Sequence, residues 1–344
     1  MSAMRLLRSL VAIAVLCAVA CGTPAPARAA AAPLVALGRN LSELSARAPG
    51  DVGVMVEDVA TGFTTGVNRG ANMPAASTIK IPVMVEVFRQ MASGTFDLNR
   101  TLTLQASDRD WGWGDLAGAP SGSRYRVSKL LTLMITESDN TATNMLIRLV
   151  GRAHINATMR SLGLRQTVVG DYIRSDGDIR SLRSSPQDMT TLLLDMVHES
   201  LVNAWSSREM IQILAGQHHN GLLPEPLPPG MTIAHKTGTL HDTLNDVGIV
   251  YLGNAPYIIS VMTTHLPSLD AGRRFIRGVS RLAFDALTRF SAWRAATQPI
   301  VPAAEAAAPV VAPDVLMWEN GGAPDATAAP PDAQPPLPLP TPLP

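Results

Sequence analysis

The sequence predicts a fold that combines helices and a sheet, α/β in the broad sense and α+β in the strict sense. We expect an antiparallel sheet built from both ends of the chain, flanked by helices, with a helical subdomain inserted between the two halves. Three observations lead to this prediction: an alternating hairpin pattern near the start, three apolar strands near the end, and a mostly helical stretch between them. Of the 344 residues, 46% are hydrophobic and 16% are charged, so the chain can bury a sizeable core.

The first elements are a helix and a hairpin. After an Ala-rich lead-in over residues 30–40, leucines at helical spacing predict a helix over 34–48. Valine then alternates with smaller or polar residues over 52–56, which predicts a half-buried strand. Thr61-Gly62 supplies the turn, and residues 65–67 form the returning strand.

The middle of the chain is predicted to be helical, and the end returns to the sheet. Helices are expected over 77–92, 127–136, 141–150, 186–201 and 206–215. The stretches 100–127 and 162–185 are loop-rich or irregular, with several glycines. Pro186 favours a helix start, because proline is tolerated in the first turn. The last elements are strands over 232–236, 246–252 and 257–264 and a long helix over 269–292.

The start of the chain is typical of an export signal, which we expect over residues 1–29. Arg5 and Arg8 precede an apolar run over 10–20, and Ala27-Arg28-Ala29 offers a small-x-small cleavage site. Such a run is too short to span a bilayer comfortably. The protein is therefore expected to be exported, to the periplasm or the medium.

A second interpretation of the start is a lipoprotein box at Ala18-Val19-Ala20-Cys21, which would tether the protein to a membrane through a lipidated Cys21. Simple secretion is preferred, because the first position of such a box is usually larger than alanine; an uncleaved anchor is the third option. Both cysteines, Cys17 and Cys21, lie in this segment, so the domain itself is expected to hold no disulfide.

Residues 30–296 are expected to form one domain, followed by a Pro/Ala-rich, disordered tail over 297–344. The formal net charge of the chain is zero. No run of like charges indicates nucleic-acid binding, and neither a metal nor a cofactor is expected.

Three short motifs follow one another along the domain: Ser77-Thr78-Ile79-Lys80, Ser138-Asp139-Asn140 and Lys236-Thr237-Gly238-Thr239. In the first motif, Lys80 lies one helical turn after Ser77 on the same face, beside its hydroxyl. Backbone N–H groups at a helix start stabilise negative charge, and burial lowers the pKa of a lysine. A serine next to a lysine that can lose its proton is an activated nucleophile.

The joint occurrence of the motifs makes the prediction specific. A serine three residues before a lysine is more often a cap or a solvated pair, and the second motif alone also fits an N-cap. However, Lys80, Lys129 and Lys236 are the only lysines among 28 basic residues, and two of them fall in the motifs. Arginine stays charged in proteins, so a base that must lose its proton requires lysine.

This motif set resembles that of class A β-lactamases and penicillin-binding proteins. The similarity spans roughly residues 36–292 and implies the β-lactamase/DD-peptidase-like fold. It also implies that Ser77 attacks the carbonyl of a β-lactam or of a D-Ala-D-Ala peptide and forms an acyl-enzyme. Lys80 would be the general base or proton relay, and Ser138 would pass a proton to the leaving nitrogen.

The resemblance also implies the substrate-binding residues. Asn140 would hydrogen-bond the amide side chain of the substrate, Lys236 and Thr237 its carboxylate, and the backbone N–H groups of Ser77 and Thr239 would form the oxyanion hole. Further residues expected at the substrate are Gly238, His235 and Trp113, with Trp111 as a second candidate wall of the cleft.

One departure from the family concerns deacylation. Class A enzymes hydrolyse the acyl-enzyme with a water held by a glutamate in a loop after the second motif, but no glutamate occurs between Glu137 and Glu199. Asp176 is a possible replacement; the other carboxylates of this loop are Asp171 and Asp178. Turn formation with neighbouring glycines is the plainer interpretation of these aspartates. Deacylation is then expected to be slow.

A second departure concerns the substrate carboxylate, which many members pair with an arginine near the third motif. Asp246 stands about where one variant has this arginine, and Asn220-Gly221-Leu222 occupies the region of another. His235 or His241 is a candidate replacement, although a hydrogen-bonded structural histidine is the plainer interpretation of either.

We therefore expect a serine hydrolase related to class A β-lactamases that acts on β-lactams. The alternative is a DD-carboxypeptidase or transpeptidase-like enzyme acting on peptidoglycan stem peptides, which the missing glutamate favours. A third hypothesis is a non-hydrolytic domain that binds cell-wall material or senses drugs.

Overall fold

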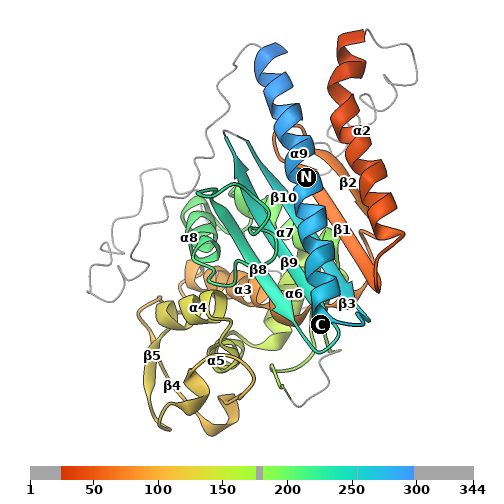
Figure 1. The fold of residues 1–344 in the computed structure, drawn as a ribbon. Helices are drawn as coiled ribbons and strands as arrows, with labels where there is room; N and C mark the ends of the chain where they lie inside the picture. The colour runs from red at the N-terminus through yellow and green to blue at the C-terminus, as the bar shows by residue number, and fades with distance from the viewer. Residues whose placement is uncertain (1–24, 176–180, 254, 298–344) are drawn as a thin grey trace, which may run out of the picture.

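The computed structural model describes residues 25–175, 181–253 and 255–297 (Figure 1). Several predictions lie outside these ranges: most of the export signal with Cys17 and Cys21, nearly all of the Pro/Ala-rich tail, and the loop carboxylates Asp176 and Asp178.

The centre of the molecule is a five-stranded antiparallel sheet in the order β2-β1-β10-β9-β8. Its strands are β1 (Asp51–Asp58), β2 (Phe63–Val67), β8 (Ile233–Thr239), β9 (Leu244–Leu252) and β10 (Ala255–Thr264). Because β1 pairs with β10 along its whole length, the N-terminal hairpin and the three C-terminal strands form one sheet. The prediction of a sheet built from both chain ends is confirmed.

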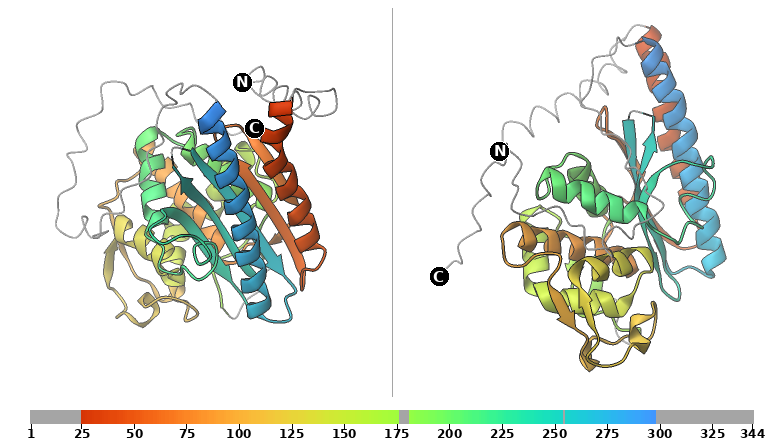
Figure 2. Two further views of the ribbon diagram at one scale, coloured as in Figure 1. Left: turned by 45° about the horizontal axis from the view of Figure 1, so that its top comes forward. Right: turned by 90° about the vertical axis from the view of Figure 1, so that its left-hand side faces the viewer.

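Two long helices, α2 (Ala25–Ser45) and α9 (Leu269–Thr297), cover one face of the sheet, and the other helices lie on the opposite face (Figure 2). The alternation along β1 explains this layering. Val52, Val54 and Val56 all point to the α2/α9 side and pack there with Leu37 and Leu41 of α2. Burying each such side chain stabilises the fold by about 1.5–3 kcal/mol.

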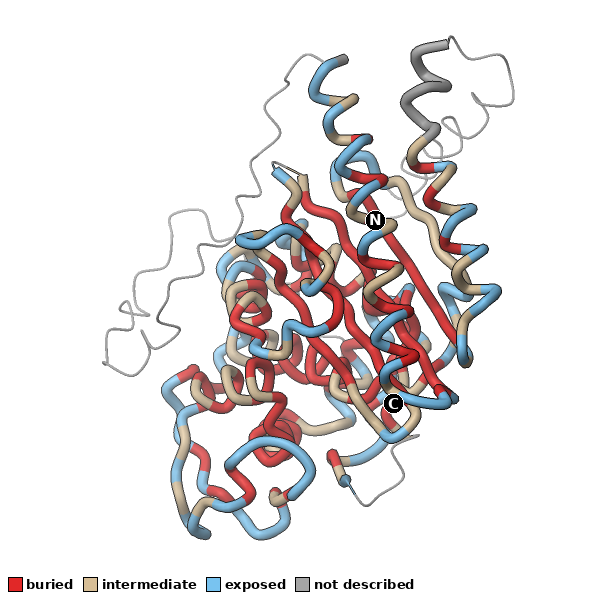
Figure 3. The backbone as a smooth tube through the Cα atoms, in the orientation of Figure 1, coloured by how far each residue is buried: buried red, intermediate tan, exposed pale blue. Residues whose placement is uncertain are grey.

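The helices on the opposite face form the helical subdomain and pack beside the three motifs. They are α3 (Lys80–Ala92), α4 (Val127–Thr136), α5 (Asn140–Val150), α6 (Arg152–Ser161), α7 (Pro186–Val197) and α8 (Ala204–Ala215). The segment that leads into α3 is a 3₁₀ turn, η1 (Ala76–Ile79), so Ser77 lies one turn before the α-helix. Buried residues concentrate in the strands and in the faces of these helices that meet the sheet (Figure 3).

Side-chain caps fix where three of these helices begin. Asp139 accepts a hydrogen bond from the N–H of Ala142 at the start of α5, and Ser185 and Asn203 do the same for α7 and α8. Pro186 occupies the first turn of α7, as expected from the sequence.

The structure adds elements that the sequence patterns did not predict. Helix α6 is one; its mostly polar sequence buries only Ile155, Thr158 and Met159, which is too few for a clear apolar stripe. Short strands also pair locally: β3 (Met73–Pro74), β6 (Val168–Val169) and β7 (Leu182–Ser184) in one sheet, β4 (Thr101–Thr103) and β5 (Arg124–Arg126) in another. In the described part of the chain, every helix is too short or too polar to cross a membrane.

Candidate active site

The three motifs meet at one cavity of about 330 Å³. η1 contributes the first motif, the turn before α5 the second, and the end of β8 the third. Among the described residues, the cavity is lined by Ser77, Trp113, Ser138, His219, Gly221, Leu222, Thr237, Thr239, Leu244, Leu269 and Arg273.

Ser77 stands where the chain turns sharply into α3. Ala76 just before it has a φ of 48°, a conformation that costs energy for a residue with a side chain. β8 approaches this turn closely at Gly238, where a Cβ atom would lie 2.9 Å from the carbonyl oxygen of Ala75 and 3.1 Å from the nitrogen of Ser77. Gly238 therefore allows close packing of β8 on the nucleophile turn, and it does not itself line the cavity.

Ser138 joins the two motif lysines. Its hydroxyl lies 3.0 Å from Nζ of Lys80 and 3.1 Å from Nζ of Lys236. Lys80 also donates to the carbonyl oxygen of Ser138 at 2.6 Å and to Oδ1 of Asn140 at 2.8 Å. In the described part of the chain, the hydrogen bonds of Lys80 thus go to the second motif, and none joins it to Ser77, which lines the cavity.

The environment of both lysines favours their neutral forms. Neither is exposed to solvent. Burial lowers the pKa of Lys80 well below its ordinary value, and the neighbouring charge of Lys236 lowers it further, while Asp139 and Asp110 act in the opposite direction. Burial lowers the pKa of Lys236 to about 7, against an opposing effect of Asp246. Lysines of this kind can accept a proton near neutral pH.

The third motif presents Thr237 and Thr239 to the cavity. His235 lies further back on β8 and does not line it. Its side chain is 1% exposed and is held between Oδ1 of Asp246 and Oδ1 of Asn220, at 2.9 Å each. The position of His235 thus corresponds to the structural interpretation rather than to contact with substrate.

Asp246 also has a structural place. Its second oxygen accepts the N–H of Leu223 at 3.0 Å, so Asp246 and His235 together fix the segment that supplies Gly221 and Leu222 to the cavity wall. His241, the other candidate for the substrate carboxylate, lines a separate cavity of about 790 Å³ beyond the end of β8, beside Asp51 and His265.

Two of the cavity residues that were not expected from the sequence, Arg273 and His219, carry polar side chains. Arg273 reaches the cavity from the first turns of α9, where it also pairs with Asp270. The ring of His219 packs edge-on against Trp113, with centroids 5.7 Å apart. No sequence signal marked either residue, because Arg273 is one of many helical arginines and His219 lies in a loop.

Asn140 and Trp113 form one connected corner. The N–H of Asn140 donates to the carbonyl oxygen of Trp113 at 3.0 Å, and Trp113 itself lines the cavity while about half exposed. Nδ2 of Asn140 donates to Oδ1 of Asp110 at 2.7 Å, so one of its two N–H groups is already used. Trp111 is 75% exposed and is not among the described lining residues.

The carboxylates near the described site form hydrogen bonds and ion pairs with other parts of the protein. None lines the described part of the cavity. Asp139 accepts the N–H groups of Ala142 and Leu116, and Asp171 forms an exposed ion pair with Arg152.

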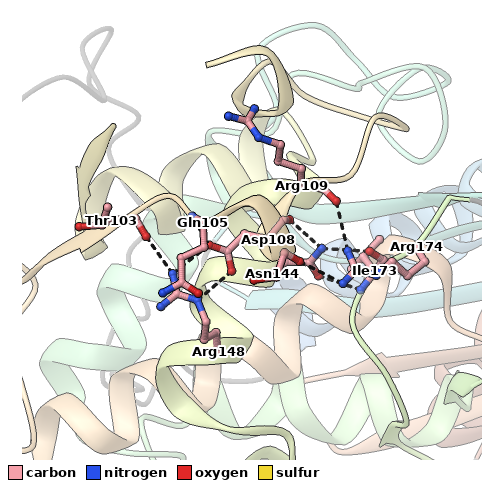
Figure 4. A network of polar contacts seen from close by, with 9 residues as sticks. Thr103, Gln105, Asp108, Arg109, Asn144, Arg148, Ile173 and Arg174 are labelled. Carbon is pink, nitrogen blue, oxygen red and sulfur yellow. Dashed lines mark hydrogen bonds and ion pairs between the residues drawn. The ribbon is translucent and has the colours of Figure 1, made fainter. Parts of the chain in front are cut away.

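The loop that follows the second motif is tied to α5 and to the segment 103–109 (Figure 4). Asn144 accepts the N–H of Ile173 at 2.8 Å and donates to its carbonyl oxygen at 3.0 Å. Arg174 donates to the carbonyl oxygens of Ser107 and Arg109. Asp108, paired with Arg148 at 2.8 Å, anchors the same segment.

Comparison with known proteins gives one consistent result. The pattern of the beta-lactamase enzyme family matches residues 36–287. A curated beta-lactamase of Streptomyces lavendulae is 27% identical over 241 residues, which is 66% of this chain and 78% of that protein.

Solved structures give the same answer. PBP-A is 31% identical with a TM-score of 0.71, over 74% of this chain and 97% of that one. A beta-lactamase from Sphaerobacter thermophilus is 29% identical with a TM-score of 0.68, over 73% and 96%. With the sheet, the motif geometry and the family match in agreement, this chain belongs to the beta-lactamase enzyme family and is a serine hydrolase.

Proposed function

We propose that this protein hydrolyses the amide bond of β-lactams through an acyl-enzyme on Ser77. The observation that carries the proposal is the hydroxyl of Ser138, which lies within hydrogen-bond distance of two buried lysines at a cavity that Ser77 also lines. This arrangement supplies a nucleophile, a base and a proton donor in one place.

In the proposed acylation, neutral Lys80 takes the proton of Ser77 as its oxygen attacks the β-lactam carbonyl carbon. The N–H groups of Ser77 and Thr239 stabilise the resulting oxyanion; one such donor is worth about 3–4 kcal/mol. Ser138 gives its proton to the leaving nitrogen as the amide bond breaks, and takes one back from protonated Lys80, to which it is hydrogen-bonded. Lys80 is then neutral again.

The cavity fits a ligand with a carboxylate and an apolar body. Arg273 supplies positive charge for the carboxylate, since guanidinium groups favour this anion, and Thr237, with Lys236 behind it, supplies hydrogen-bond donors. Arg273 would take the place of the arginine that the third-motif region lacks. Trp113, Leu222, Leu244 and Leu269 are the apolar wall.

A second candidate function is that of a DD-peptidase-like penicillin-binding enzyme on peptidoglycan stem peptides. The observation that favours it is that no carboxylate lines the described cavity, so a base for deacylation is absent from the part of the site that the structure describes. A variant of PBP-A, 30% identical to this chain, has been solved as an acyl-enzyme complex with penicillin G.

Mass spectrometry and turnover of a chromogenic cephalosporin separate these functions. Steady turnover by the purified protein supports β-lactam hydrolysis. A single stoichiometric burst with a long-lived adduct on Ser77 supports the penicillin-binding alternative. A protein whose mass stays unchanged in penicillin, or a Ser77→Ala variant that keeps ligand binding and cellular phenotype, would overturn both and favour a non-hydrolytic role.

We further propose that the protein is exported through the signal over residues 1–29, with simple secretion preferred over lipidation of Cys21. The intact mass of the mature protein tests this. Cleavage after Ala29 supports secretion, whereas an N-terminal Cys21 carrying lipid supports a membrane tether. A protein that retains residue 1 contradicts both.

A further inference from the structure

Asp110 is a buried carboxylate that the three motifs do not include. It is 4% exposed and lies in the segment that leads to Trp113. Oδ1 accepts hydrogen bonds from Nδ2 of Asn140 at 2.7 Å and from the N–H of Gly112 at 3.0 Å. Oδ2 accepts from the N–H and the hydroxyl of Ser175, at 2.6 and 3.0 Å. One side chain thus joins the second motif, the segment 110–113 that ends at Trp113 (hereafter the rim) and the loop after Ile173.

The partners of Asn140 determine which way its amide faces. A carboxylate only accepts hydrogen bonds, so Asp110 requires the NH₂ group of Asn140 on its side. The amide oxygen then faces Nζ of Lys80, at 2.8 Å. With the amide reversed, Asp110 would face an oxygen and Lys80 would face an NH₂ group, which removes an acceptor from the lysine. Asp110 therefore sets the orientation of the group that holds Lys80.

The same contacts leave little room for movement. A Cβ atom at Gly112 would lie 2.7 Å from Cβ of Ser175 and 3.2 Å from Nδ2 of Asn140, so the rim packs directly on both. The backbone of Asp110 is fixed as well, because its N–H donates to the hydroxyl of Thr141 at 3.1 Å. The rim, the start of α5 and the segment 173–175 are held as one unit around this carboxylate.

We propose that Asp110 is a positioning residue for acyl transfer: it fixes the amide of Asn140 so that Oδ1 holds Lys80 and one N–H of Asn140 stays available to the substrate. This inference rests on the proposed acylation of Ser77. Asp110 acts through Asn140 and is not a base, because each of its carboxylate oxygens already accepts two hydrogen bonds from donors in the described part of the chain.

The first test is the rate of Ser77 acylation by penicillin, measured by mass spectrometry against pH. An Asp110→Asn variant offers one acceptor oxygen in place of two, and we expect acylation to slow by about 10- to 100-fold. The pH at which the rate reaches half its plateau is expected to fall, because a negative charge beside Lys80 is lost while Lys236 and Asp139 remain. A rate and pH midpoint equal to those of the wild type would refute the proposal.

The second test is a double-mutant cycle with Asn140→Ala. If Asp110 acts through Asn140, Asp110→Asn slows acylation no further once Asn140 is alanine; independent, multiplicative losses would overturn the proposal. Asp188→Asn is the matched control. Asp188 is also a buried carboxylate and accepts from the N–H of Gln166 and the hydroxyl of Thr167, but among the described residues it forms no hydrogen bond or ion pair with a motif residue. It is expected to lower the unfolding temperature and leave the pH midpoint unchanged.

Thermal unfolding first establishes that each variant folds. If Asp110→Asn does not fold, the same cycle is run with Asp110→Glu, which keeps the charge and displaces the carboxylate by one methylene. Wild-type protein that penicillin leaves unacylated would refute the proposed function. Wild-type acylation with an unaffected Asp110 variant would refute only the positioning role.

Discussion

At the scale of single residues, the site contains two kinds of side chain. Some belong to short sequence motifs, and others reach the cavity only through tertiary contacts. Ser77, Lys80, Ser138 and Lys236 stand in short motifs, so their proximity could be predicted from the sequence. Asp110 and Arg273 could not: Asp110 is bonded to Asn140 across 30 residues of sequence, and Arg273 comes to the cavity from α9, outside all three motifs. His235, expected at the substrate, lies behind the cavity, where a hydrogen bond to Asp246 on the neighbouring strand holds it.

Arg273→Ala tests the charged end of the cavity. We expect KM for an anionic β-lactam to rise about 10-fold, equivalent to about 1.4 kcal/mol, with little change in kcat, because a contact with the carboxylate is made in both ground and transition states. Steady-state kinetics, or acylation kinetics if turnover is slow, measures the change. Arg274→Ala is the control, since Arg274 is exposed beside Arg273 but is not among the described lining residues. Equal effects of the two variants would show that Arg273 contributes only general charge.

At the scale of elements, the strands and most helices follow from period-two and helical apolar patterns. Most observed ends differ from the predicted ones by a few residues, but α2 begins at Ala25 and not at the predicted residue 34. β8 continues to Thr239, three residues beyond the predicted end, because Thr237, Gly238 and Thr239 pair with β9. Helix α6 escaped prediction since its polar sequence is stabilised by packing on other elements. A local sequence pattern thus fails to predict a helix that is stabilised mainly by its packing on neighbouring elements.

Gly238→Ala tests the close approach of β8 to the nucleophile turn. The added methyl group would press on Ala75 and on the nitrogen of Ser77, so the oxyanion donors must move apart. Acylation is expected to slow by about 100-fold, while the free energy of unfolding falls by about 1–3 kcal/mol. Gly118→Ala, where a Cβ meets nothing within 4 Å, is the control. An unchanged acylation rate in Gly238→Ala would show that the approach is not needed.

Glu57 on β1 makes stability depend on pH. Burial raises the pKa of Glu57 to about 7, and the charges of Asp195 on α7 and of adjacent Asp58 add to the effect. The folded protein then holds a proton that the unfolded chain releases above its own pKa of 4.5. The stabilisation, on the order of 3 kcal/mol, is complete below that value and is lost as pH rises through 7.

A Glu57→Gln variant should remove this dependence. Urea unfolding at pH 5, 6, 7 and 8, values from about two units below the pKa of Glu57 in the folded protein to about one unit above it, is expected to show declining stability for the wild type and a flatter profile for the variant. Glu43→Gln, on the exposed surface of α2, should retain the wild-type slope. Parallel profiles for wild type and Glu57→Gln would contradict this assignment.

At the scale of the whole molecule, the fold depends on contacts between the two ends of the domain. α2 packs on α9, and Leu34, Leu37 and Leu41 share a core with Phe275, Ile276 and Val279. The composition of the tail predicted a segment outside this core, and the positions of the strand patterns along the chain predicted a sheet built from both chain ends. The packing of α2 against α9 was not, because an amphipathic pattern shows which face is apolar and not what covers it.

Two truncations test this dependence on the chain ends. Deletion of residues 298–344 is expected to leave the unfolding temperature and the acylation rate unchanged. Deletion of residues 25–45 is expected to expose the α2-facing apolar surface and to abolish cooperative unfolding, since several buried leucines are lost. Differential scanning calorimetry measures the unfolding of both truncated proteins, and mass spectrometry with penicillin measures the acylation rate. A protein that unfolds cooperatively without α2 would contradict the expectation.

The antiparallel packing of α2 and α9 places Ala25 and Thr297 at the same end of the molecule, away from the subdomain formed by α4 and α5 (Figure 1). A fusion partner, surface linker or affinity handle attached to either end of the described chain is therefore joined at that pole. Attachment to a solid support through either end would therefore leave α4 and α5 on the side of the molecule that is turned away from the support (Figure 1).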